Sequence, residues 1–222
     1  MARRAKAEAA AVEPAASSWR VWGVDFDARI AQLVIVSLTV LILAFNNRVI
    51  DHAYDRFVLE FLVPMAIILV VWREDPRRYG LTLGDWRRGL PITLAGIAVM
   101  AVVIWIVVQQ PDFKHYYTFS LAGRPTWRLI VDTGVDLLAW EFFCRGWLLW
   151  GLARRYGADA IWLQVIPFTL MHVYKPQLEQ FSTILGGAFF GILAWRTRSM
   201  IWGWLLHWFM MAWVLLLVAG QV

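Results

Sequence analysis

The chain has 222 residues, of which 60% are hydrophobic and 17% charged, and its formal net charge at pH 7 is +5. Long uninterrupted apolar runs predict a membrane protein, because a soluble domain of this length has little use for such segments. The basic residues lie in short connectors between these runs, so the positive charge does not indicate nucleic-acid binding. A single cysteine, Cys144, excludes an internal disulfide and a multi-cysteine zinc site.

The N-terminal segment predicts no packed structure. It is rich in alanine and polar side chains, and its first twenty residues lack the apolar centre of a signal peptide. Such a segment buries too little apolar surface to fold by itself. We therefore expect residues 1–28 to form a disordered cytoplasmic tail.

Apolar segments then follow one another along the chain. They predict an all-α polytopic membrane protein with about seven transmembrane helices, because a helix satisfies its own backbone polar groups in lipid. The expected spans are residues 30–47, 57–73, 91–109, 128–152, 158–174, 179–195 and 200–219. Several are shorter than the roughly 20 residues that cross a bilayer, so the fifth and sixth could instead form one re-entrant unit. The small residues of GGAFFG (186–191) favour a packed helix face over this alternative.

Lysine and arginine are unevenly distributed among the connectors. If the N-terminus lies inside, the connectors on that side hold most of these residues, among them Arg87, Arg88, Arg154 and Arg155. Connectors rich in Lys and Arg remain on the cytoplasmic side of a membrane. We therefore expect an integral protein of the bacterial cytoplasmic membrane, surrounded by membrane lipids, with a cytoplasmic N-terminus.

Ionisable side chains occur inside several predicted spans. Each costs about 2.5–3.5 kcal/mol on insertion scales, so each needs a partner or a function. These residues are Asp132, Asp136, Glu141 and Arg145 in the fourth span, His172 in the fifth and His207 in the seventh. Glu141 and Arg145 are four residues apart and can form an ion pair on one helix face. Such a pair, or one histidine, is readily explained by packing alone, whereas all of them together indicate a functional site.

One carboxylate and two imidazoles support hydrolytic chemistry. Glu141 and His172 could deprotonate a water, and His207 could donate to the oxyanion that forms on the attacked carbonyl. The same three residues could instead hold zinc or another divalent metal with an open water position. The histidines lack the local spacing of a His-x-x-x-His site, so we expect no cofactor. A nucleophilic Cys144 is less favoured than a small buried cysteine.

Three short motifs carry these residues. WEFFCRG (140–146), FTLMH (168–172) and HWFMM (207–211) resemble the signatures of the CAAX prenyl endopeptidase and bacteriocin-processing (CPBP, ABI-type) family of intramembrane proteases. The resemblance implies a protease-like core at 127–222, formed by the C-terminal four helices. Residues 29–126 would then hold N-terminal transmembrane helices and an amphipathic linker, because YGLTLGDWRRGL (79–90) is similar to the linker that often precedes this core.

Carried over residue by residue, the resemblance implies catalytic roles for Glu141, Arg145, His172 and His207. In the family, a glutamate before the position of Glu141 and the second-motif histidine activate water, and the third motif helps to hold the oxyanion. Members are described both as metal-dependent and as metal-free glutamate proteases.

The sequence departs from the family pattern at two positions. Trp140 replaces the first glutamate of the first motif, and Met211 replaces a small polar residue of the third. Glu141 could take over as the base, with Arg145 orienting it, or Asp136 could supply a carboxylate one turn earlier. Met211 cannot donate a hydrogen bond, so His207 would stabilise the oxyanion alone or with backbone help.

Lys175 and Glu179 form a second pair with a spacing of four, near the predicted outer mouth of the fifth and sixth spans. The simpler interpretation is a solvated loop pair. The functional interpretation is that one of the two lines a substrate entrance or replaces the missing carboxylate.

The residues therefore predict an intramembrane endopeptidase that hydrolyses a membrane-associated, lipidated or CAAX-like peptide with glutamate- and histidine-activated water. The alternative is a weak or inactive relative that binds a peptide or partner, such as an immunity or assembly factor. A transporter could use the same buried groups, but no paired half-repeats support it.

Overall fold

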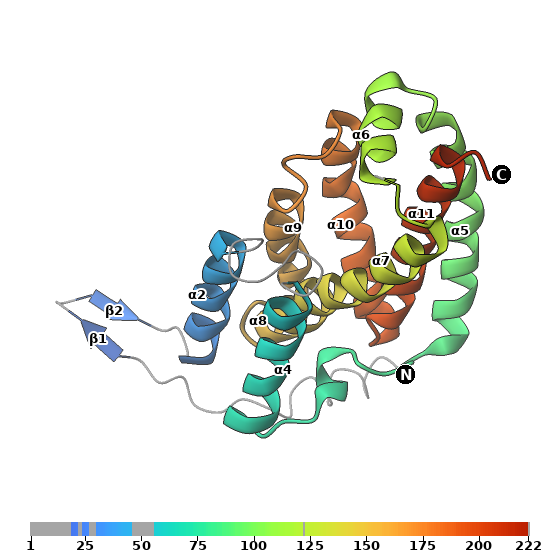
Figure 1. The fold of residues 1–222 in the computed structure, drawn as a ribbon. Coiled ribbons are helices and arrows are strands. Elements are labelled where there is room, and N and C mark those ends of the chain that lie inside the picture. Colours follow the sequence, from blue (N-terminus) through green and yellow to red (C-terminus); the bar gives the residue numbers. More distant parts are fainter. Residues whose placement is uncertain (1–18, 22–23, 27–29, 46–55, 122, 222) are drawn as a thin grey trace.

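The structure is a computed structural model that describes residues 19–21, 24–26, 30–45, 56–121 and 123–221 (Figure 1). Helices make up nearly all of this part of the chain. The elements are β1 (Trp19–Val21), β2 (Val24–Phe26), α2 (Ile30–Phe45), η1 (Phe57–Leu62), α4 (Val63–Ala66), η2 (Ile67–Val71), η3 (Pro76–Tyr79), α5 (Trp86–Val107), α6 (Pro111–Leu121), α7 (Thr126–Glu141), η4 (Phe142–Leu148), α8 (Leu149–Tyr156), η5 (Gly157–Asp159), α9 (Ala160–Leu170), α10 (Gln177–Thr197) and α11 (Ile201–Val218).

The predicted helical class is confirmed, and a helix occupies the position of each predicted apolar segment within the described residues. Three of these helices, α5, α10 and α11, are long and apolar enough to cross a membrane. The protein is thus an integral membrane protein. The count of about seven transmembrane passes, the bacterial membrane and the cytoplasmic N-terminus stay predictions.

The fifth predicted span, 158–174, is too long at its C-terminal end. α9 has 11 residues and stops at Leu170, which gives a length of about 16 Å against a hydrocarbon core of about 30 Å. Beyond it the chain reverses through turns, with backbone bonds from His172 N to Thr169 O and from Lys175 N to His172 O. Pro176 then disfavours helical geometry at the residue before it. His172 therefore lies on a turn rather than within a helix.

Two other segments differ from the sequence-based expectations. The predicted disordered tail contains the antiparallel hairpin β1–β2, for which Val21, Val24 and Phe26 have favourable strand propensity; the rest of 1–28 lies outside the described residues. The connector before the fourth span contains α6. Pro111 at its start and Asp112 in its first turn suit a helix N-terminus.

The continuous helical run of α7, η4 and α8 forms the centre of the molecule. Side chains of its middle part are fully buried all round, among them Phe142, Phe143 and Trp147. A helix that is apolar on every face needs neighbours on every side. η1, α9 and α10 pack around η4, and α11 packs against α7 and α5. The first motif therefore lies in the interior of the bundle.

α9 and α10 form a close antiparallel pair through the predicted small-residue face. A Cβ on Gly187 would lie 2.9 Å from the Phe168 ring, and one on Gly191 would lie 2.9 Å from Gln164. The Gln164 amide also donates to the Gly187 carbonyl at 2.8 Å. The predicted packed face is confirmed, and it fixes the end of α9 from which His172 projects.

The segment before α5 is tied to the end of α10. Asp85 N donates to Thr197 O at 2.7 Å, and Gly84 adopts a positive φ of 51° beside that carbonyl. A Cβ on Gly84 would lie 2.0 Å from Thr197 O. Gly123 has a similar φ of 72°, but nothing lies within 4 Å of its Cβ position.

These two glycines give a matched test of the contact between the segment before α5 and the end of α10. Gly84→Ala and Gly123→Ala both place a side chain at positive φ, but only the first also collides with backbone. We expect Gly84→Ala to lower the free energy of unfolding by about 1–3 kcal/mol more than Gly123→Ala. Thermal unfolding in lipid nanodiscs measures this difference, and equal midpoints for the two variants would contradict the packing described.

A charged network holds the connector between η2 and α5 to α8. Arg154 Nη1 donates to Glu74 Oε1 at 2.7 Å, and Tyr79 donates to the same carboxylate at 2.7 Å. The hydrogen bond from Arg154 lowers the pKa of Glu74, with a smaller contribution from Tyr79. Burial and the Glu74 hydrogen bond raise the pKa of Tyr79, so its hydroxyl stays protonated and donates.

The lowered pKa of Glu74 predicts a pH dependence of stability. A folded-state pKa below the ordinary 4.5 means that the stabilisation is complete above that pH and is lost as pH falls through the folded-state value. We expect Glu74→Gln to unfold at a lower temperature than wild type at neutral pH, and the two midpoints to converge in acid. If the difference between the two unfolding midpoints stayed the same in acid, the lowered pKa of Glu74 would be contradicted.

Candidate active site

Glu141, at the end of α7, is the centre of a buried polar group. Neither Glu141 nor Arg145 has any exposed side-chain surface, and Arg145 Nη1 lies 3.1 Å from Glu141 Oε1. His207, on α11, places its Nδ1 2.7 Å from the same oxygen. The ion pair that the spacing predicted is therefore present, and it also holds one of the two predicted histidines.

Gly203 on α11 also lies beside the Glu141 carboxylate. Gly203 and His207 are four residues apart and lie on the same helix face. A Cβ on Gly203 would lie 3.4 Å from Glu141 Oε2, which is an ordinary van der Waals contact, so α11 packs closely on the carboxylate without requiring a glycine there. α11 thereby brings the third motif onto the first.

Two aromatic rings enclose the Arg145 guanidinium. Its Cζ lies 4.0 Å from the centroid of the Phe168 ring and 5.1 Å from that of Phe190. Such cation–π contacts strengthen away from water. Phe168 of the second motif thus acts as packing for the first motif, a role that sequence spacing does not reveal.

A backbone carbonyl four residues earlier in the chain orients the His172 ring. Its Nδ1 lies 2.7 Å from the Phe168 carbonyl oxygen, and because a carbonyl only accepts, Nδ1 carries the hydrogen. The Nε2 of the neutral ring is then free to accept a hydrogen bond. The ring centroid lies 5.0 Å from that of Trp140 and 4.8 Å from that of Phe168.

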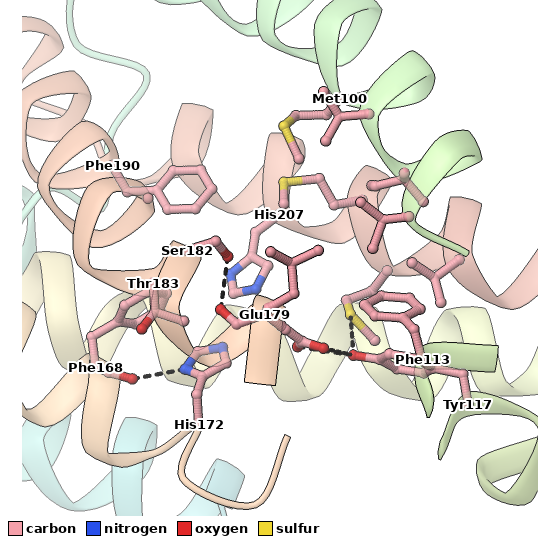
Figure 2. A pocket seen from close by; sticks show the side chains of 18 residues that line it. Met100, Phe113, Tyr117, Phe168, His172, Glu179, Ser182, Thr183, Phe190 and His207 are labelled. Carbon is pink, nitrogen blue, oxygen red and sulfur yellow. Dashed lines mark hydrogen bonds between the residues drawn. The ribbon is translucent and has the colours of Figure 1, made fainter. Parts of the chain in front are cut away.

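Both histidines open onto one cavity of about 250 Å³ (Figure 2). α5, α6, α10 and α11 form most of its wall, which is largely apolar. Its polar lining consists of Tyr117, His172, Glu179, Ser182, Thr183 and His207. The structure therefore brings the two predicted histidines to the same surface, together with a tyrosine that the sequence analysis missed.

Glu141 does not belong to that cavity lining. It is fully buried behind His207, and its Oε1 is already occupied by Arg145 and by the imidazole. A base must come within hydrogen-bond reach of the water that it deprotonates. The expected role of Glu141 as this base does not fit the geometry; Glu141 is placed to act through His207.

Asp136 does not line the cavity onto which the histidines open. Its carboxylate pairs with Arg56 at 2.6 Å, and both side chains are partly exposed. The Arg56 guanidinium also lies 4.7 Å from the centroid of the Trp140 ring. Asp136 therefore stabilises the packing of η1 on α7 and does not supply the carboxylate missing at position 140.

The pair of Lys175 and Glu179 is present at the edge of the cavity. Lys175 Nζ lies 3.8 Å from Glu179 Oε1. Tyr117 on α6 donates to both oxygens of Glu179, at 2.9 and 2.7 Å, and Lys175 donates to the Tyr117 hydroxyl at 3.3 Å. Burial, together with the neighbouring Glu179 carboxylate, raises the pKa of Tyr117, so the phenol stays protonated as a donor.

The two departures from the family pattern are both part of the site. Trp140 is 3% exposed, and its ring packs beside both imidazoles, 5.0 Å from His172 and 6.3 Å from His207. Met211 lines the cavity, with its Sδ 3.8 Å from the Tyr117 hydroxyl. An aromatic ring and a thioether thus occupy positions where a carboxylate and a polar donor were expected.

The predicted alternative metal ligands do not form a metal site. In the described residues, no three His, Cys, Asp or Glu side chains are grouped closely enough to hold a metal ion. Glu141 Oε1 lies 2.7 Å from His207 Nδ1, so this ring nitrogen is already engaged by the carboxylate. Cys144 is fully buried and does not line the cavity, so it is not placed to attack a substrate.

Comparison with protein families identifies the C-terminal part of the chain. Residues 122–213 match the model of a protein family named Rce1-like. Its description is type II CAAX prenyl endopeptidase Rce1-like. This match confirms the resemblance drawn from the three motifs and covers all of them. No curated protein and no solved structure matches the chain.

The buried pair gives a test that needs no assay of activity. Removing one partner of a buried ion pair leaves an uncompensated charge, which costs about 3–5 kcal/mol. We expect Arg145→Met and Glu141→Gln to destabilise the protein and the double variant to recover much of the loss. Thermal unfolding of the four proteins in nanodiscs measures the coupling. Additive losses in the double variant would show that the two side chains do not interact.

Proposed function

We propose that this chain is an intramembrane endopeptidase that hydrolyses a membrane-associated peptide with water held between His172 and His207. One observation carries the proposal. Two imidazoles from different parts of the bundle open onto a single cavity, and each has its Nδ1 engaged on the protein side. The family match over 122–213 supports peptide hydrolysis as the class of reaction.

The partners of the two rings suit different roles. His172 donates from Nδ1 to a carbonyl, so its free Nε2 accepts a hydrogen bond from water and orients it. His207 has a carboxylate at Nδ1, which fixes the ring and balances positive charge on it. When protonated, His207 donates from Nε2 to the oxyanion that forms on the substrate carbonyl. Glu141 and Arg145 are then positioning residues.

The rest of the cavity indicates the kind of substrate. Its apolar wall includes Met100, Ile104 and Val107 of α5 and Val214 of α11. A wall of this kind holds a hydrophobic group, and the few polar residues at one side fix its orientation. A hydrophobic side chain or a lipid group next to the scissile bond fits this division, with the membrane lipids surrounding the enzyme.

Cleavage of a quenched lipidated peptide by the purified protein in nanodiscs tests the proposal. We expect His172→Ala and His207→Ala each to lower kcat/KM by about 10²–10³, the usual cost of one lost transition-state contact. His115→Ala is the matched control, because His115 is exposed and does not line this cavity; it should cleave at the wild-type rate.

The alternative function is distinguished in the same assay. Peptide binding by all four proteins without cleavage by any of them would contradict the endopeptidase and support a peptide-binding membrane protein. Equal loss in the His115 variant would also contradict the proposed site, because it would show a general effect of removing an imidazole.

A further inference from the structure

One carboxylate does reach the cavity, and it lies outside the three motifs. Among the residues that line the cavity, Glu179 is the sole acidic side chain in the described part of the chain. Glu141 is sealed behind His207, and Asp136 is paired with Arg56. The family's first glutamate is absent because Trp140 stands there. The site therefore has a carboxylate in the cavity, but on α10 instead of α7.

Glu179 is held in a defined position. It lies in the first turn of α10, where a negative charge is favourable. Tyr117 donates to both of its oxygens, and the Lys175 ammonium lies 3.8 Å away. Each carboxylate oxygen has a second lone pair that these contacts leave free to accept a proton. In Figure 2 the Glu179 side chain enters the cavity between the Tyr117 phenol and the imidazole rings.

We propose that Glu179 is the catalytic residue that takes the proton from the attacking water. This inference rests on the proposed endopeptidase function and completes it, because His172 orients the water and His207 holds the oxyanion, but neither role removes the proton. The chain thus places its base on the helix that follows the second motif, in compensation for the tryptophan at position 140.

The proposed reaction is hydrolysis of an amide bond. Glu179 accepts one proton from water while the water oxygen forms a bond to the carbonyl carbon, and the carbonyl π electrons move to its oxygen. The tetrahedral intermediate then collapses as the C–N bond breaks. The proton held by Glu179 passes to the leaving nitrogen, so the products are a carboxylic acid and an amine, and Glu179 returns to its ionised form.

The alternative is that Glu179 has a structural role only and holds α10 against α6 through its hydrogen bond with Tyr117. Two substitutions separate these roles. Glu179→Gln keeps an oxygen that accepts from Tyr117 but cannot accept the proton. Tyr117→Phe removes the hydrogen bond between the helices but leaves the carboxylate in place.

The experiment measures kcat and KM for the quenched peptide in nanodiscs. We expect Glu179→Gln to lower kcat by about 10²–10⁴, the range for loss of a general base, with KM changed less than threefold. Tyr117→Phe should lower kcat less than tenfold. Glu179→Asp, which retains a carboxylate, should be more active than Glu179→Gln. Asp112→Asn is the matched control, because Asp112 is exposed and outside the cavity.

Each result has one meaning. If Glu179→Gln keeps activity within threefold of wild type while the His172 and His207 variants lose it, the role of Glu179 is wrong and the proposed function stands. Equal losses in Glu179→Gln and Tyr117→Phe, or an Asp variant no better than Gln, also overturn the role of Glu179. If wild type does not cleave, the proposed function fails and this inference fails with it.

Discussion

A carboxylate and a guanidinium share the interior of this protein without contact with solvent. Charges removed from water are stable only when they are paired and enclosed, so the helical run that carries Glu141 and Arg145 needs neighbours on all sides. Those neighbours are the elements that form the site: α9 contributes the Phe168 ring over the guanidinium, and α11 contributes the imidazole of His207 to the carboxylate. The contact of His207 Nδ1 with the buried carboxylate therefore fixes the position of this imidazole at the cavity wall.

The site consequently has a sealed side and an open side. On the sealed side the charges are fixed and inaccessible, which suits orientation of a ring rather than contact with substrate. On the open side, His172 and His207 face an apolar cavity that also contains Glu179. Electrostatic interactions at such a boundary are strong because bulk solvent is excluded, which suits the proposed hydrolysis of a hydrophobic peptide. Trp140 packs beside both imidazoles and does not itself line the cavity.

Sequence patterns predicted the parts of this arrangement that depend on local spacing. The apolar runs predicted the helices, and a spacing of four predicted the pair of Glu141 and Arg145, because neighbours on one helix face are determined by helical geometry alone. Lys175 pairs with Glu179 at the same spacing, although Lys175 lies in the turn before α10. The contact of Tyr117 with Glu179 was not predicted, since α6 has the composition of a connector and the two residues are 62 positions apart. The orientation of Glu141 was not predicted either. Whether a buried carboxylate faces a cavity or the back of a ring depends on how α7 and α11 pack.

The protonation and hydrogen bonding of the two imidazoles directly report whether the buried carboxylate positions His207 alone. ¹⁵N NMR of the protein in nanodiscs, with labelled histidine nitrogens, reports which ring nitrogen carries the hydrogen. We expect hydrogen on Nδ1 of His172 with a bare Nε2, and we expect Glu141→Gln to change the signals of His207 but to leave those of His172 in place. Hydrogen on Nε2 of neutral His172, or equal changes at both rings, would contradict these expectations.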